Sequence, residues 1–89
     1  MIRVKVVYRL WLRDKTKVSE EIFELTESMD LLELISKIID KYPHLTKLIG
    51  DIFRKDNPII INVNGVAVSK NVKLKNGDKV TLIPPVSGG

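Results

Sequence analysis

Cysteine is absent from the 89-residue sequence, and this absence excludes several kinds of chemistry at once. A chain without thiols has no disulfide framework, no thiolate metal site and no cysteine nucleophile. Long apolar runs are also missing, because Arg, Lys or Asn interrupts each of them. No stretch has the length of a membrane helix, and charges occupy the N-terminal segment where a signal peptide needs an apolar centre. We therefore expect a cytoplasmic protein without a membrane partner.

The sequence has little excess of charge of one sign and no dense block of basic residues. Fifteen basic residues against eleven acidic ones give a net charge of +4, but they are scattered, without the dense basic block typical of nucleic-acid binding. We expect a solvated surface and no nucleic-acid partner. Asp51 and Asp56 lack the glycine-centred loop and the neighbouring ligands of a calcium site, and His44 is the single histidine, so no metal site is predicted.

The first part of the chain alternates between apolar and polar residues, which is typical of a strand with one buried face. Residues 14–17 predict a polar turn, and residues 20–27 predict a returning strand with Phe23 and Leu25 inward. The two segments together predict a hairpin. The inward residues of the first strand are expected to be Ile2, Val4, Val6, Tyr8, Leu10 and Leu12.

The apolar residues then change to a helical period. Ser28 is the predicted N-cap, since its hydroxyl can accept a bond from a first-turn amide, and Asp30 favours the positive end of the helix. Pro43 ends the helix, and a further short helical turn is predicted before Gly50. The helical stripe comprises Leu31, Leu34, Ile35, Ile38 and Tyr42.

The C-terminal part predicts strands separated by tight turns, and residues 58–68 contain the third strand and the turn that follows it. Asn64 and Gly65 tolerate the positive backbone angles of a turn, and a short extra strand near residues 66–68 is possible. A second turn at residues 76–78 leads into a last strand at residues 79–83. The order β-β-α-β-β predicts an α+β fold, in which one main helix covers a mixed four- to five-stranded sheet with the first and last strands at its centre. This is a β-grasp arrangement.

A specific pattern of residues runs from the third strand to the C-terminus. It comprises Val63-Asn64-Gly65, Leu74, Gly77-Asp78, Val80 and Pro84-Pro85-Val86-Ser87-Gly88-Gly89. The pattern resembles the ubiquitin-like sulfur carriers, in particular the small subunit of molybdopterin synthase. The thiamin-pathway carrier of that group usually lacks the proline pair. Archaeal ubiquitin-like protein modifiers can carry a very similar tail, so they stay open as an alternative.

The resemblance implies a carrier without turnover of its own, with residues 1–83 forming the domain and 84–89 a flexible, extended tail. In the family an adenylating enzyme uses ATP to activate the terminal carboxylate, here that of Gly89, and sulfur then replaces AMP to give a thiocarboxylate. The carrier binds no cofactor, and its partners are that enzyme and the large synthase subunit, which supplies the catalytic residues for the molybdenum or tungsten cofactor. In the alternative, Gly89 forms isopeptide bonds with lysines, or the sulfur serves tRNA thiolation.

The composition of the tail suits insertion into a partner. Gly88 and Gly89 have no Cβ, so the end can pass through a narrow channel. Pro84 and Pro85 fix φ and hold the base of the tail extended. Six residues span roughly 20 Å when fully extended, which is enough to enter another protein's active site. The residues expected to insert are Pro84, Pro85, Val86, Ser87 and Gly88.

A second candidate site is the outward face of the sheet. Strand parity places Thr81 and Ile83 on this face, with Val7 and Trp11 on the first strand and Ile60 on the third. Exposed apolar patches often mark interfaces, and aromatic residues often anchor them. Trp11 is open to two interpretations, because a shift of one residue in the strand register would bury it. The resemblance implies that Ile83 contacts the larger partner.

Overall fold

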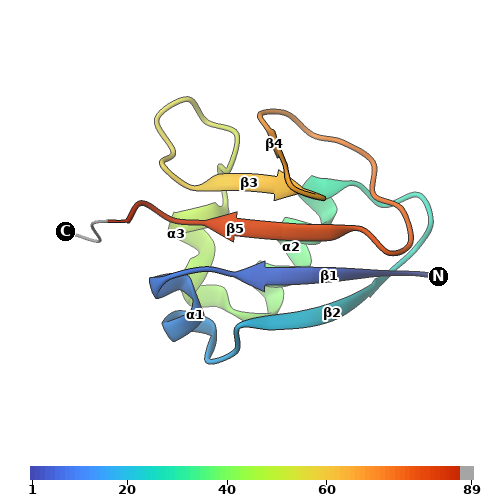
Figure 1. Ribbon diagram of the computed structural model, residues 1–89, viewed down its shortest axis with the longest axis horizontal. Coiled ribbons are helices and arrows are strands. Elements are labelled where there is room, and N and C mark those ends of the chain that lie inside the picture. The colour runs from blue at the N-terminus through green and yellow to red at the C-terminus, as the bar shows by residue number, and fades with distance from the viewer. Residues whose placement is uncertain (87–89) are drawn as a thin grey trace.

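The computed structural model describes residues 1–86 and has a five-stranded mixed sheet at its centre (Figure 1). The strands follow the order β2-β1-β5-β3-β4, with β1 and β5 parallel and every other neighbouring pair antiparallel. The predicted α+β β-grasp arrangement is therefore confirmed, including the central pair formed by the first and last strands. The strands are β1 (Ile2–Tyr8), β2 (Glu20–Leu25), β3 (Ile60–Val63), β4 (Val66–Val68) and β5 (Lys79–Ile83).

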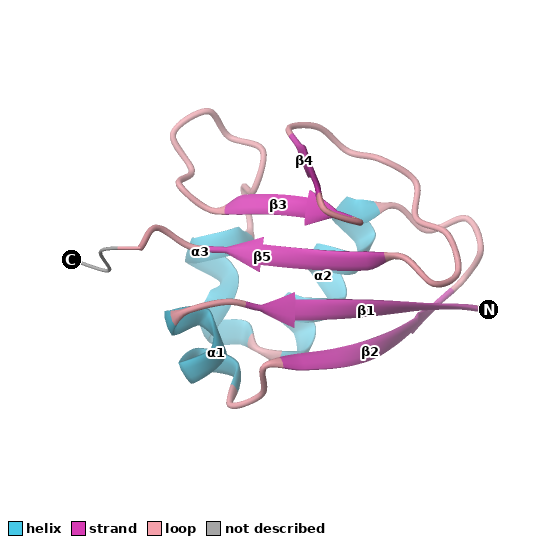
Figure 2. Ribbon diagram, viewed as in Figure 1, coloured by secondary structure: helices cyan, strands magenta, loops and turns pink. Residues whose placement is uncertain are grey.

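The helices lie together on one face of the sheet, as the cyan ribbons in Figure 2 show. The main helix buries Leu31, Leu34, Ile35 and Ile38 of the predicted stripe in one core with residues of β1 and β5, whereas Tyr42 follows the helix and is partly buried. Val4, Val6 and Leu82 of the strands are fully buried in this core. The predicted short helical turn is also confirmed, as a 3-10 turn followed by a four-residue helix. The helical elements are α1 (Trp11–Thr16), α2 (Leu31–Lys41), η1 (Pro43–Leu45) and α3 (Thr46–Ile49).

The N-cap of α2 is Asp30, so the prediction of Ser28 as the cap is wrong. The Asp30 carboxylate accepts a hydrogen bond from the Glu33 amide at 2.9 Å, and the Glu33 side chain accepts one from the Asp30 amide at 3.3 Å. This reciprocal pair satisfies two donors of the first turn. Ser28 lies two residues too early to do so.

The first strand ends at Tyr8, whereas the alternation predicted a strand through Arg13. Leu10, predicted to point inward, is 42% exposed. Leu10 has a φ of 51° and a ψ of −133°, which interrupts the extended backbone. The chain then forms α1, so the predicted turn at residues 14–17 is wrong. Tyr8, Leu12 and Thr16 are buried and spaced by four residues, a spacing that fits a helix as well as it fits alternation. The predicted pairing of the two strands is nevertheless confirmed, with Phe23 opposite Val4 on the inner face.

The motif residues of the C-terminal half hold two turns together. Asn64 and Gly65 have φ angles of 53° and 85°, as the predicted turn requires. The Asn64 side chain accepts from the Lys79 amide at 2.9 Å and donates to the Asp78 carboxylate at 2.9 Å. That carboxylate also accepts from the Lys75 amide at 2.7 Å. These residues therefore fix the start of β5 and, through it, the direction in which the C-terminus leaves the domain.

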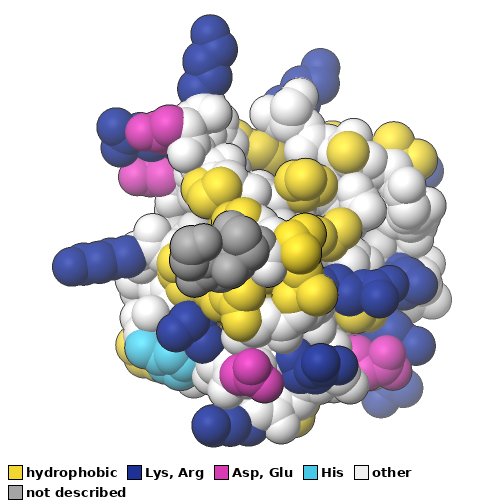
Figure 3. Space-filling view, turned by 60° about the vertical axis from the view of Figure 1, so that its left-hand side comes forward, with side chains coloured by type: hydrophobic (Ala, Val, Ile, Leu, Met, Phe, Trp, Pro, Cys, Tyr) yellow, Lys and Arg dark blue, Asp and Glu magenta, His cyan; other side chains and the backbone are white. Residues whose placement is uncertain are grey.

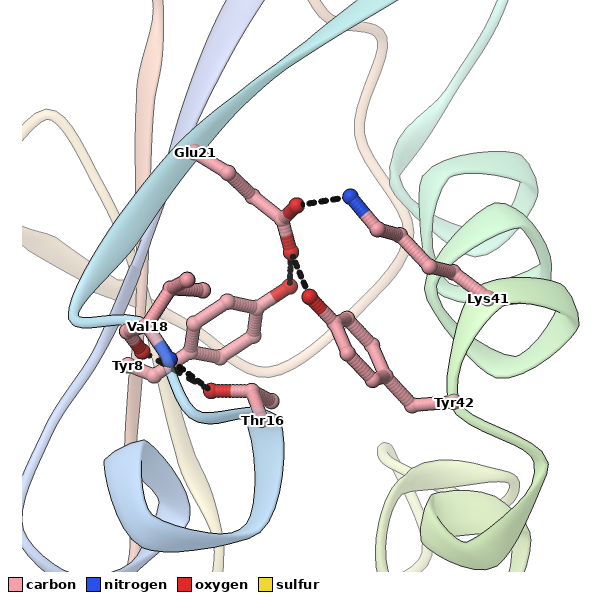
Figure 4. Close-up of polar contacts among 6 residues, drawn as sticks. All are labelled: Tyr8, Thr16, Val18, Glu21, Lys41 and Tyr42. Atoms are coloured by element: carbon pink, nitrogen blue, oxygen red, sulfur yellow. Dashed lines mark hydrogen bonds and ion pairs between the residues drawn. The ribbon is translucent and has the colours of Figure 1, made fainter.

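A carboxylate lies on the inner face of β2, at the only charged inward position of that strand. Glu21 is opposite Val6, and its side chain is 12% exposed. Figure 4 shows that it points toward α2 and accepts hydrogen bonds from the hydroxyls of Tyr8 and Tyr42, at 2.7 and 2.9 Å, while Lys41 binds its other oxygen. The network ties β1, β2 and the end of α2 together.

The network changes the pKa values of its members. Partial burial by itself raises the pKa of Glu21, but the hydrogen bonds from Lys41, Tyr8 and Tyr42 outweigh it, so that the pKa lies below its ordinary value. Burial, together with the bond to the carboxylate, raises the pKa of the Tyr8 hydroxyl. The folded state therefore favours an ionised Glu21 and a neutral Tyr8.

Glu21→Gln is expected to lower the free energy of unfolding at pH 7 by about 1–2 kcal/mol, because it replaces bonds to a charged acceptor by neutral ones. Since the pKa of Glu21 is lower in the folded state, the stabilisation is complete above the unfolded pKa of about 4.3 and is lost as the pH falls below it. Urea unfolding at pH 7 and near pH 3 should show the difference between wild type and variant shrinking in acid.

The matched control for this substitution is Glu24→Gln on the same strand. Glu24 is 58% exposed and pairs with Arg3 at 3.6 Å. An exposed pair of this kind contributes little, so the control should change stability by less than about 0.5 kcal/mol. Equal effects of the two substitutions, or a Glu21→Gln effect that does not change with pH, would contradict the role given to the network.

Candidate functional site

The C-terminal strand carries the chain out of the domain at the middle of one end of the sheet (Figure 1). β5 lies between β1 and β3, and the Arg9 amide donates to the Leu82 carbonyl at 3.1 Å just beyond the end of β1. Pro84 is buried, whereas Pro85 is exposed and Val86 is 85% exposed. The domain thus buries the chain as far as Pro84, so Pro84 is not part of a free tail as predicted, and the exposed part of the chain begins at Pro85.

The base of the tail is tied to α1. The indole Nε1 of Trp11 donates a hydrogen bond to the Pro85 carbonyl at 3.0 Å. Trp11 also lines a shallow groove with Leu48 of α3 and with Ile59. Its side chain is half-buried, and the Lys15 ammonium lies 5.9 Å from the centre of its ring.

Trp11 therefore does not lie on the outward face of the sheet, and that prediction is wrong. Both sequence interpretations placed it on a strand, whereas the turn at Leu10 moves it onto a helix beside the tail. The bond to Pro85 spans 74 residues of sequence. No local pattern indicates such a contact, which is why sequence reasoning missed it.

The other predicted residues of the sheet face do come together next to the tail. Register pairs join Val7 with Thr81 and Ile60 with Ile83, so that all four lie on the face away from the helices. Ile60 is 52% exposed, and Val7 and Ile83 are half-buried. We call Val7, Ile60 and Ile83 the outer-face patch. Figure 3 shows hydrophobic side chains around the base of the tail.

Thr81 is on the predicted face, but its side chain is only 6% exposed. It lies on the central strand, with Val7 of β1 on one side and Asn62 of β3 on the other. On a central strand, the side chains of the two adjacent strands cover a short side chain from both sides. Thr81 therefore offers a partner little surface, contrary to its prediction as a contact residue.

The remaining predicted site residues, Ser87, Gly88 and Gly89, lie outside the described residues. Within residues 1–86, no group of three His, Asp or Glu side chains is close enough together to hold a metal ion. No helix in this same part of the chain has the length and apolar character needed to cross a membrane. His44 donates from Nε2 to the Lys15 carbonyl at 2.8 Å, which is a structural bond near the end of α1.

Within the described residues, the base of the tail leaves the domain beside the apolar outer-face patch. Residues 6–89 of the sequence match the ThiS family, so the match includes the tail. The chain belongs to the ThiS family. The resemblance found in the sequence is thereby confirmed.

Relatives of this ThiS-family chain match along nearly its whole length. A molybdopterin synthase sulfur carrier subunit of Chlamydomonas reinhardtii is 33% identical over 88 residues, which are 99% of this chain and 100% of the relative. A structure from Pyrococcus furiosus, described as subunit 1 of a molybdopterin converting factor, is 34% identical with a TM-score of 0.84. The alignment covers 97% of this chain and all of the other.

Two further solved structures are similar to this chain. Small archaeal modifier protein 1 of Methanosarcina acetivorans is 29% identical, with a TM-score of 0.79 and coverage of 100% of this chain and 98% of the other. A complex of subunits 1 and 2 of the molybdopterin-converting factor of Helicobacter pylori contains a chain that is 22% identical. The TM-score is 0.63, and the alignment covers 99% of this chain and 100% of the other. At this identity the likeness concerns the fold alone.

Proposed function

We propose that this protein is a sulfur carrier, activated at the Gly89 carboxylate by adenylation and converted there to a thiocarboxylate that donates sulfur for molybdopterin synthesis. The observation that carries the proposal is the family match, which extends through the last residue of the chain. The sulfur carrier subunit that is 33% identical over 99% of the chain supports the same function. The exposure of Pro85 and Val86, where the tail begins, fits a chain end that another protein receives.

The activated atom is a main-chain carbon, so the carrier needs no catalytic side chain. A carboxylate resists nucleophiles because it is negatively charged and resonance-stabilised. Its oxygen attacks the α-phosphorus of ATP, pyrophosphate leaves, and the product is an acyl adenylate. A sulfide-level nucleophile from a sulfur donor then attacks the carbonyl carbon. The new C–S bond forms as the C–O bond to AMP breaks, so that AMP departs and a thiocarboxylate remains.

The body of the protein positions the chain end for a partner. Five residues follow the buried Pro84, and they span roughly 17 Å when fully extended. The outer-face patch lies at the base of this segment, where a protein that receives the tail has to approach. We assign to the outer-face patch the contact with the large synthase subunit, which supplies the catalytic residues. Only the tail enters the active site of that subunit. The adenylating enzyme is the second partner, and a cytoplasmic location stays a prediction.

Mass spectrometry of the intact protein tests this function. After incubation with ATP, the adenylating enzyme of the same organism and a sulfur donor, the chain should gain the mass difference between sulfur and oxygen. Fragmentation should place the gain at Gly89, and omission of ATP should prevent it. An unchanged C-terminus, under conditions that charge a known carrier, would show that the proposed function is wrong.

A second candidate is a protein modifier, because the archaeal modifier protein is 29% identical and matches over the full chain. In this function an acceptor lysine amine attacks the adenylated Gly89 carbonyl. The C–N bond forms as the C–O bond to AMP breaks and the amine loses a proton, so that AMP departs and an isopeptide bond takes the place of the thiocarboxylate. Proteolysis of cellular proteins would then leave Gly-Gly remnants on lysines. Their detection, dependent on this gene, would favour the modifier. Thiocarboxylate without remnants would favour the carrier.

A further inference from the structure

Most of the net charge of the protein comes from one short segment. Residues 9–17 contain four basic residues and one acidic residue, a net charge of +3, while the whole chain carries +4. All four basic side chains are exposed. We call them the basic patch: Arg9, Arg13, Lys15 and Lys17.

The charges of the basic patch are not neutralised by the domain. On the strands, Arg3 pairs with Glu24 at 3.6 Å and Lys5 with Glu20 at 3.5 Å. By contrast, none of the ion pairs among residues 1–86 includes a side chain of the basic patch. Asp14 is the one acidic residue of the segment, so an unbalanced positive surface remains.

Two bonds hold the basic patch beside the base of the tail. The Arg9 amide donates to the Leu82 carbonyl at 3.1 Å, and the Trp11 indole donates to the Pro85 carbonyl at 3.0 Å. Figure 3, which looks toward this end of the molecule, shows basic side chains outside the hydrophobic ones that surround the tail. A protein that takes up the tail has to approach α1, whose Trp11 is bonded to the base of the tail and which carries Arg13 and Lys15. Charges that come closer than the Debye length of about 8 Å at physiological salt attract each other with little screening.

We propose that the basic patch docks against acidic side chains at the mouth of the channel through which the adenylating enzyme receives the tail. This inference rests on the proposed function. The enzyme has to bind and release the carrier in every cycle, and complementary charges mainly raise the rate of association. The outer-face patch and the basic patch then differ in role: the first supplies apolar contact with the large subunit, and the second speeds association with the adenylating enzyme.

The experiment measures the association rate constant of the full-length protein with the adenylating enzyme by stopped flow at several salt concentrations. The patch variant is Arg13→Glu with Lys15→Glu. The matched control is Lys70→Glu with Lys75→Glu, which changes the net charge equally in the loop between β4 and β5. Figure 1 shows this loop away from the tail, toward the opposite end of the sheet. At about 0.03 M salt the patch variant should associate about tenfold more slowly than wild type, and the control less than about threefold.

The salt dependence completes the test. The association rate constants of wild type and control should fall as the salt concentration rises to about 0.5 M. At that concentration the patch variant should associate at nearly the same rate as both. Equal rates for patch variant and control at low salt would overturn the inference, as would a wild-type rate independent of salt. Binding of a labelled tRNA gives a further check. If wild type bound this tRNA more tightly than it binds the enzyme, and the patch variant did not bind the tRNA, the inference would be overturned in favour of a nucleic-acid partner.

Failure of the inference can be told apart from failure of the proposed function. Adenylation of Gly89 is measured separately, as pyrophosphate exchange at saturating carrier. Normal exchange by both variants with identical association rates contradicts only the docking role of the basic patch. Absence of exchange by wild type contradicts the proposed function, while the association rates still decide the role of the patch. Urea unfolding confirms that both variants are folded.

Discussion

Removal of Gly88 and Gly89 is expected to abolish adenylation and sulfur transfer while leaving the fold and the subunit contact nearly intact. The truncation moves the terminal carboxylate back by roughly 7 Å. A misplacement of about 1 Å from the reacting group can lower a rate about a hundredfold, so the truncated chain should react at background. The domain should be unaffected, because Pro84 is the last buried residue in the described part of the chain. Pyrophosphate exchange and thiocarboxylate formation, both at saturating carrier, are the measurements.

A length-preserving substitution provides the control for this truncation. Ser87→Ala keeps the carboxylate at the same distance from Pro85 and leaves both glycines in place, so its exchange rate should stay within a few fold of wild type. Binding of the truncated chain to the large synthase subunit should persist through the outer-face patch. Normal charging of the truncated chain would contradict the whole proposal, and loss of subunit binding along with charging would show that the tail supplies most of the contact.

The strands, the main helix and the two C-terminal turns were predictable because each rests on a local pattern. Asn64 and Gly65 are residue types suited to positive φ, and the structure places both there. Leu10 has a φ of 51° without belonging to such a type. The end of β1 therefore had no local indication, and the helix that follows was missed. Tyr8, Leu12 and Thr16 offered the one available cue, a spacing of four.

Contacts between distant segments explain what else the sequence did not reveal. The Trp11–Pro85 bond joins residues 74 positions apart, and the Glu21 network joins three elements. An acidic residue at an inward strand position is a usable cue for such a network, since a buried carboxylate requires partners. The role of Gly89 as the activated residue, by contrast, was assigned from the resemblance of the whole C-terminal pattern. Neither strand alternation nor helical periodicity indicates that a chain end is reactive.

Ile60→Asp is expected to weaken binding to the large synthase subunit by about thirtyfold or more, the equivalent of about 2 kcal/mol for an interface hot spot. Ile60 is 52% exposed and lies opposite Ile83, next to the strand end from which the tail emerges. A carboxylate placed there would lose its water on binding, without a partner in an apolar contact. Because the isoleucine is already half in solvent, the unfolding free energy should change far less than the binding free energy. Titration calorimetry and urea unfolding measure the two quantities.

Ile22 provides a closely matched control on the same sheet face. Its side chain is 53% exposed, and it lies on the edge strand β2, opposite Lys5. Lys5 in turn pairs with Lys79, at the start of β5 and so away from the tail. Ile22→Asp removes the same apolar group and adds the same charge, so its effect on binding should stay below about threefold if the contact surrounds the base of the tail. Equal losses from both substitutions would place the interface across the whole outer face, and no loss from Ile60→Asp would move it off this face altogether. A loss confined to Ile60→Asp would place the subunit contact beside Ile83, at the end of β5 where the tail begins.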